Sequence, residues 1–127
     1  MKTAQGTIVV PTADGGTEEL PGVFYFDFDQ AIVKPAGFDE LNQHAEVLKG
    51  DPSFQVRLEG NADERGTREY NLALGERRAN AVKAYLVAQG VSPSQIEVIS
   101  YGEEKPAVMG HNEEAWAKNR RVQIVYK

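Results

Sequence analysis

The sequence contains no cysteine, and this absence excludes several kinds of chemistry. A disulfide, a thiol nucleophile and a cysteine-ligated metal centre are all ruled out. The two histidines, His44 and His111, lie far apart and have no other ligands at metal-binding spacing. We therefore predict no metal site and no cofactor, and we expect a solvated or capping role for both histidines.

Long apolar runs are missing as well. No stretch approaches the ~20 residues of a membrane helix, and the first ten residues lack the pattern of a signal peptide. Two possibilities stay open on composition alone. Either the protein is cytoplasmic, or the chain is a mature or truncated form without its export signal.

The chain also lacks an excess of positive charge. Its net charge of −5 argues against binding to nucleic acid, which needs clustered lysine and arginine. Residues 1–51 hold nine acidic against three basic residues, so the acidic bias is N-terminal. A length of 127 residues, with 41% apolar and 26% charged residues, predicts one ordinary globular domain.

The N-terminal part gives the weakest structural signals. Residues 11–22 are rich in proline, glycine and acidic residues, which predicts a loop. Residues 7–10 fit either a short strand or a disordered segment. We therefore expect residues 1–22 to form an N-terminal tail or loop, and residues 23–127 to form the domain.

Hydrophobic periodicity predicts the elements of that domain. Strands are expected over residues 23–28, 54–58, 96–101 and 122–126, and helices from residue 35 to 50, 69 to 89 and 113 to 118. The core side of the long helix is expected to carry Leu72, Gly75, Ala79, Val82 and Leu86. The order β-α-β-α-β-α-β on four strands favours an α+β two-layer sandwich with helices packed on one face.

The most unusual stretch is residues 60–78, GNADERGTREYNLALGERR. Asn71, Leu74 and Arg78 share one helix face at the edge of the core stripe, where we expect partial exposure. The loop that carries Asp63 lies beside the start of this helix. An aspartate and an arginine together suit an amino-acid zwitterion. A structural Asp63–Arg78 ion pair with Asn71 as a helix cap is the competing interpretation.

Enzymatic alternatives have little support. Asp27 and Asp29 lie two residues apart and would need a sugar cleft to act as a glycosidase pair. No serine stands in a nucleophile-elbow motif. For Arg120 or Arg121 we expect a partner acid at the sheet edge, and for Trp116 a packing role.

Four motifs resemble a known family: YFDFD at 25–29, EGNADERGTREYNLALGERRA at 59–79, SYGEEKPAVMGH at 100–111 and NRRV at 119–122. They are similar to the OmpA-like peptidoglycan-binding domain, and within it to the Pal lipoproteins, over roughly residues 23–127. The resemblance implies a mixed four-stranded sheet and a non-catalytic protein. It also implies binding to the diaminopimelate residue of the peptidoglycan stem peptide.

The resemblance assigns roles to particular residues. Asp63 and Arg78 match the pair that holds the amino-acid end of diaminopimelate, and Asn71, Leu74, Phe28 and Asp29 match further pocket residues. It implies a periplasmic protein that is associated with the outer membrane through a lipid anchor and has a TolB-type partner in a Tol-Pal system. An interaction module with little peptidoglycan affinity is the alternative.

The sequence departs from the family pattern at two points. Asn61 stands where the family usually has histidine, while the aspartate of that loop, Asp63, is present. The N-terminal cysteine that carries the lipid in the Pal lipoproteins is absent. We therefore expect either a truncated form or an unanchored relative, with the membrane reached only through an anchor outside this chain.

Overall fold

The structure is a computed structural model that describes residues 2–4, 7–12 and 14–127. Its centre is a mixed four-stranded sheet in the order β4-β7-β5-β6. These strands are β4 (Val23–Tyr25), β5 (Val56–Asn61), β6 (Ile96–Gly102) and β7 (Arg121–Tyr126). β7 is antiparallel to both of its neighbours, and β5 is parallel to β6. The predicted mixed sheet is confirmed.

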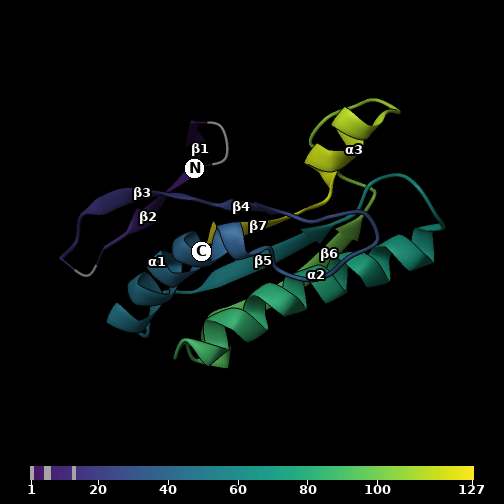
Figure 1. Cartoon of the computed structure of the whole chain (residues 1–127). Helices are drawn as coiled ribbons and strands as arrows, with labels where there is room; N and C mark the ends of the chain where they lie inside the picture. The colour runs from purple at the N-terminus through teal and green to yellow at the C-terminus, as the bar shows by residue number, and fades with distance from the viewer. Residues whose placement is uncertain (1, 5–6, 13) are drawn as a thin grey trace.

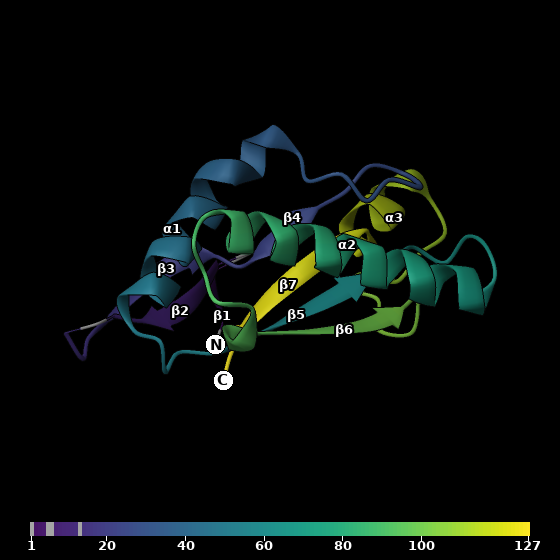
Figure 2. The ribbon, with the colours of Figure 1, turned by 90° about the horizontal axis from the view of Figure 1, so that it is seen from below.

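Two helices cover one face of this sheet, α1 (Phe38–Gly50) and α2 (Arg68–Ala88) (Figure 2). A 3-10 turn, η1 (Pro35–Gly37), leads into α1, and a second, η2 (Pro93–Gln95), precedes β6. The short α3 (Glu113–Asn119) lies at the end of the sheet where β7 begins (Figure 1). The α+β two-layer architecture is therefore confirmed. No helix in the described ranges is long and apolar enough to span a membrane.

Local sequence signals explain where α2 begins and ends. The Thr67 hydroxyl accepts a hydrogen bond of 3.1 Å from the amide of Tyr70, so Thr67 caps the helix. Asn71, which we considered as a cap, lies inside the helix. Gly90, with φ of 106°, provides the left-handed residue that ends it.

The hydrophobic core lies between the helices and the sheet. α2 contributes Gly75, Ala79, Val82 and Leu86, as periodicity predicts, whereas Leu72 is only half-buried. α1 contributes Leu41, Ala45 and Leu48, and β5 contributes Val56 and Leu58.

Two glycines allow α2 to approach β5 unusually closely. A Cβ atom on Gly60 would lie 1.8 Å from the carbonyl oxygen of Gly75, and one on Gly75 would lie 2.3 Å from the Ser100 hydroxyl. Both distances are far below van der Waals contact. The backbone of the helix therefore rests directly on the backbone of the strand, which fixes the start of α2 relative to the loop after β5.

The N-terminal segment forms a second sheet, which corrects the expected tail or loop over residues 17–21. Its strands β1 (Lys2–Ala4), β2 (Thr7–Pro11) and β3 (Thr17–Pro21) pair antiparallel in that order. The polar residues around Gly15 form only the turn between β2 and β3, and Gly15 has φ of 88°. Ile8, Val10 and Leu20 are buried in the main core, so this segment packs on the domain.

His44 also differs from the expectation of a solvated or capping side chain. It is completely buried on α1. Its Nε2 lies 2.6 Å from the carbonyl oxygen of Pro21, and its Nδ1 lies 2.8 Å from the Tyr126 hydroxyl. His44 therefore joins α1 to β3 and β7. Burial lowers the pKa of this imidazole, which favours the neutral form.

The first strand of the domain is shorter than predicted. β4 ends at Tyr25, and only the amide of Phe26 still reaches the carbonyl oxygen of Arg120, at 2.9 Å. The chain then turns, with a hydrogen bond of 3.1 Å from the amide of Gln30 to the carbonyl oxygen of Asp27. Asp29 has φ of 58°, a left-handed conformation that aspartate tolerates better than most residues.

Candidate ligand-binding site

A cavity of about 400 Å³ lies where the turn after β4, the loop after β5 and the start of α2 meet. It is lined by Phe28, Asp29, Ala62, Asp63, Arg65, Gly66, Thr67, Tyr70, Asn71, Leu74 and Arg78. All six residues that the sequence singled out as site residues thus line one cavity. Their role in binding stays a prediction.

Arg78 forms the floor of this cavity and is completely buried. It donates to three carbonyl oxygens, those of Gln30 at 2.7 Å, Asn61 at 2.9 Å and Asp27 at 3.1 Å. Within the described ranges no carboxylate lies within ion-pair distance of it. Burial lowers the pKa of Arg78 to about 10, so the guanidinium still carries its charge at neutral pH.

The structure therefore corrects two expectations about this helix face. Asp63 and Arg78 do not form an ion pair with each other. Asn71, Leu74 and Arg78 are buried rather than partly exposed, at 1%, 5% and 0%. For Arg78 the physical reason is that the turn at residues 27–30 places its carbonyl groups on the guanidinium, a contact that helical spacing cannot reveal.

Asp63 instead binds Arg65. The Asp63 carboxylate accepts from the Arg65 amide at 3.0 Å, from Nε at 3.2 Å and from Nη2 at 2.8 Å. Arg120 adds a second cation at 3.6 Å. Burial alone would raise the pKa of Asp63, but the hydrogen bonds and charge of Arg65 outweigh it and hold the pKa below its usual value.

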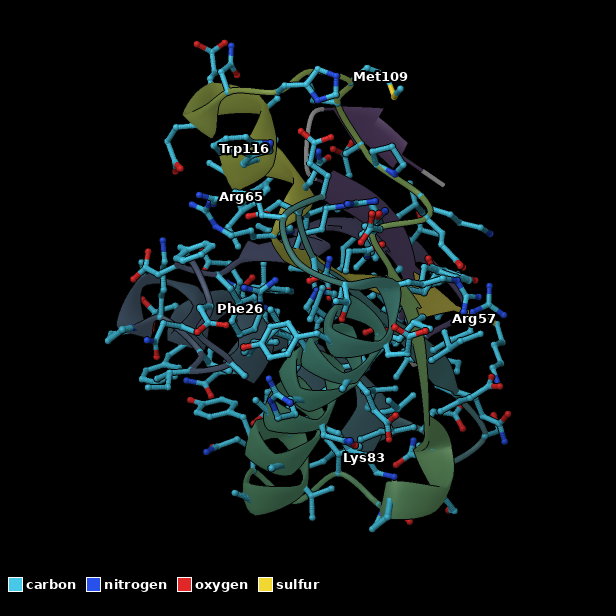
Figure 3. The ribbon with its side chains drawn as sticks, turned by 90° about the vertical axis from the view of Figure 1, so that its right-hand side faces the viewer. Phe26, Arg57, Arg65, Lys83, Met109 and Trp116 are labelled. Carbon is cyan, nitrogen blue, oxygen red and sulfur yellow. The ribbon has the colours of Figure 1, made fainter. Side chains whose placement is uncertain are left out.

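Arg65 lies between two aromatic rings. Its guanidinium carbon is 4.0 Å from the centre of the Phe28 ring and 4.1 Å from the centre of the Trp116 ring. Figure 3 shows Arg65 next to Trp116. This arrangement is a cation–π sandwich on one side of the cavity. The expected packing role of Trp116 is compatible with this contact, and its Nε1 also donates to Glu64 at 2.8 Å. Sequence reasoning did not identify Arg65, because its role depends on residues from three distant segments.

We expected either Arg120 or Arg121 to form an ion pair with an acid, and Arg120 does so. Its Nη2 lies 2.9 Å from Glu113, and its Nε donates to the carbonyl oxygen of Phe26 at 2.8 Å. Arg120 is also the second cation beside Asp63, so it supports the cavity rather than only the edge of the sheet. Arg121 donates instead to Gln123 and to carbonyl oxygens.

Asp29 is the exposed acid of the cavity. Its carboxylate accepts a hydrogen bond from the Tyr70 hydroxyl, and this bond raises the pKa of Tyr70. No cation of the described residues lies within ion-pair distance of Asp29. The neighbouring Asp27 is not among the residues that line this cavity and pairs with Lys34 at 2.9 Å.

The two asparagines at the site have structural partners. Asn71 donates from Nδ2 to Glu103 at 2.6 Å and so links α2 to the loop after β6. Asn61, which stands where the resemblance led us to expect histidine, is buried and supplies a carbonyl oxygen to Arg78. No group of three or more metal-ligating side chains occurs in the part of the chain that the structure describes.

Comparison with known proteins gives a consistent result. Residues 25–120 match the OmpA family. The chain belongs to the OmpA family. It is 57% identical over 101 residues to a peptidoglycan-associated lipoprotein of Pseudomonas aeruginosa, covering 80% of this chain and 60% of that protein. A peptidoglycan-associated lipoprotein of Legionella pneumophila is 46% identical over 105 residues.

Two solved structures agree with the fold. The crystal structure of the peptidoglycan-associated lipoprotein from Burkholderia pseudomallei superposes with a TM-score of 0.83 at 48% identity, covering 84% of this chain and 90% of that one. The C-terminal domain of Helicobacter pylori MotB gives 0.75 at 22% identity, covering 83% of each chain, and supports the fold alone. This chain spans 60% of the Pseudomonas and Legionella relatives.

Proposed function

We propose that this chain is a non-catalytic domain that binds the peptidoglycan stem peptide through its diaminopimelate residue. The observation that carries the proposal is a buried guanidinium without a carboxylate partner among the described residues, at the floor of a cavity that also holds acids. Burial lowers the pKa of Arg78, whereas the nearby negative charges of Asp63 and Asp29 raise it.

These charges suit the amino-acid end of diaminopimelate. A carboxylate of the ligand would accept from the Arg78 guanidinium, for which a planar oxygen pair is the best match. The ligand ammonium would bind to Asp29, which has no cationic partner among the described residues, and to the remaining acceptor capacity of Asp63. Leu74 and Phe28 would contact the aliphatic chain between the two ends.

The burial of Arg78 sets a condition on this binding. Water does not reach the guanidinium, so a ligand carboxylate requires the turn at residues 27–30 to open. Opening would release the two donors that now bond to Asp27 and Gln30. A ligand carboxylate would then replace two carbonyl oxygens with a charged acceptor, which forms stronger hydrogen bonds.

Titration with free diaminopimelate, followed by amide chemical shifts, tests the proposal. We expect saturable shifts at Asp29, Asp63 and Asn71, and weaker ones with cadaverine, which lacks both carboxylates. Pimelate, which lacks both amino groups, is the second control. Equal responses to all three compounds, or none at millimolar concentration, would refute diaminopimelate recognition at this cavity.

We further propose that the protein acts at the outer membrane, because its relatives are peptidoglycan-associated lipoproteins. The domain would hold the cell wall from the periplasm, and a lipid anchor outside this chain would hold the membrane. Many domains on one sacculus would add avidity to modest single-site affinity. If the outer membrane detaches from the cell wall in cells that carry a cavity variant, this result would support the role.

A protein partner of the TolB type is the second candidate. Two exposed aromatic residues at the cavity support it, Phe28 at 54% and Tyr70 at 44% exposure. Aromatic residues are enriched in protein interfaces relative to the rest of the surface. If both ligands use this surface, diaminopimelate will displace the protein partner in a competition experiment, whereas separate surfaces will allow a ternary complex.

A further inference from the structure

A second candidate site lies at the outer edge of the sheet, away from the cavity around Arg78. β4 is the last strand of the order β4-β7-β5-β6. On its inner side, the amide of Ile124 donates to Gly22 at 2.8 Å and the amide of Phe26 donates to Arg120 at 2.9 Å. Strand alternation then directs the N–H and C=O groups of Val23 and Tyr25 outward. Among the described residues no strand pairs with this edge.

An apolar cavity of about 280 Å³ lies beside this edge. Phe24, Tyr25 and Phe26 line it from β4 and the residue after it, and Val33 and Ala36 line it from the segment that leads into α1. Tyr25 remains 42% exposed. An unpaired edge next to an apolar hollow is the combination that binds an extended peptide by strand addition.

The same cavity contains an unsatisfied carboxylate oxygen. Glu40 lines it, and its Oε2 is buried without a hydrogen-bond partner in the described part of the chain. Lys34, the basic residue of this cavity, pairs with Asp27 at 2.9 Å. A buried charged acceptor without a donor is costly, so this oxygen favours a cationic group that is supplied from outside.

The wider charge distribution favours the same kind of ligand. Residues 1–51, which include β4 and Glu40, hold nine acidic and three basic residues. Such an excess attracts cationic segments and repels acidic ones. A lysine or arginine side chain also matches the cavity in shape, because its aliphatic stem can lie on the apolar lining while its head reaches the carboxylate.

We propose that this edge binds an extended segment of a partner protein that carries a lysine or arginine. The main chain of the segment pairs with Val23 and Tyr25, and its cationic side chain lies in the apolar cavity and ends at Glu40. This site shares no residue with the cavity around Arg78, and the proposal does not depend on peptidoglycan binding.

The probe is the peptide acetyl-Thr-Val-Lys-Val-Thr-amide, with glutamine in place of lysine as the matched control. Amide chemical shifts of the full chain report the position of binding. We expect saturable shifts at Val23, Tyr25 and Gly37 with a Kd of about 1 mM. The control peptide and the Glu40→Gln variant should each weaken binding about tenfold, the effect of one charge-assisted hydrogen bond.

Val23→Pro removes an outward N–H that an added strand needs, and edge strands accept proline at such positions. This variant should lose binding, whereas Val23→Thr should keep it. Absence of saturable shifts at β4 with the wild-type chain, or equal binding of both peptides, overturns the proposal. Dimers in sedimentation that Val23→Pro abolishes would also overturn it, because a second copy of the chain would then occupy the edge.

Discussion

At the scale of single residues, Asp29 is the acid that can bind a ligand ammonium without first losing a cation. It is exposed and its φ of 58° suits asparagine as well as aspartate. Asp29→Asn should therefore leave the melting temperature within a few degrees of the wild type. Binding of diaminopimelate should fall by about tenfold or more, since a charge-assisted bond is lost. Unchanged affinity in calorimetry would remove Asp29 from the site.

Arg78 should lose stability as well as binding when it is replaced, because its three carbonyl contacts are structural. Arg78→Lys keeps the charge but not the fork of donors. We expect a loss of about 1–3 kcal/mol in the free energy of unfolding for each carbonyl group left without a donor. Urea unfolding measures it, and Arg77→Lys, at an exposed position on the same helix, is the control. Equal stabilities of the two variants would contradict the structural role.

At the scale of elements, the contact between α2 and β5 determines where the cavity lies. Gly75→Ala in a helix ordinarily stabilises, by about 0.5–1 kcal/mol. Here the added methyl group would meet the Ser100 hydroxyl at 2.3 Å and the Gly60 backbone at 2.9 Å. We expect a loss of about 1–3 kcal/mol instead, measured by thermal or urea unfolding. Glu76→Ala is the exposed control, and a more stable Gly75→Ala variant would show that the helix can move away.

The same elements show what the sequence could predict. The 3.6-residue period of α1 and α2 and the alternation of β7 depend on local burial, so element order and core were predictable for residues 23–127. The N-terminal sheet was not, because its short strands lie among loop-type residues. The contacts of Arg78 were not, because they require the backbone conformation of a turn about fifty residues away in the chain. Asp63 illustrates the same limit. Its position at the site followed from the motif, but its partner Arg65 depends on stacking between Phe28 and Trp116.

At the scale of the whole molecule, His44 joins the N-terminal sheet to α1 and to the last strand. Burial lowers the pKa of His44 in the folded protein, so the unfolded chain binds a proton that the folded chain does not. Stability should therefore fall as the pH drops below about 6.5, the ordinary histidine pKa. The lowered pKa of Asp63 affects stability in a lower pH range. The stability that this carboxylate contributes is lost only as the pH falls below about 4.

Urea unfolding between pH 7.5 and 5.5 tests this prediction. The wild-type free energy of unfolding should decrease over this range. His44→Phe should be less stable at pH 7.5 because it loses the bonds to Pro21 and Tyr126, and its pH dependence should be flatter. His111→Phe, at an exposed position, is the control. A wild-type stability that does not change over this range would show that the folded protein accepts the proton without penalty.

The place of β7 in the sheet has a consequence for folding kinetics. β7 is the last strand of the chain, yet it lies between β4 and β5 and joins them. During synthesis the sheet therefore stays divided until residues 121–126 are available, and its closing contacts span about a hundred residues of chain. Contacts of such long sequence separation slow folding. A chain that is released a few residues early would leave two incomplete half-sheets with exposed edges, which are prone to aggregate.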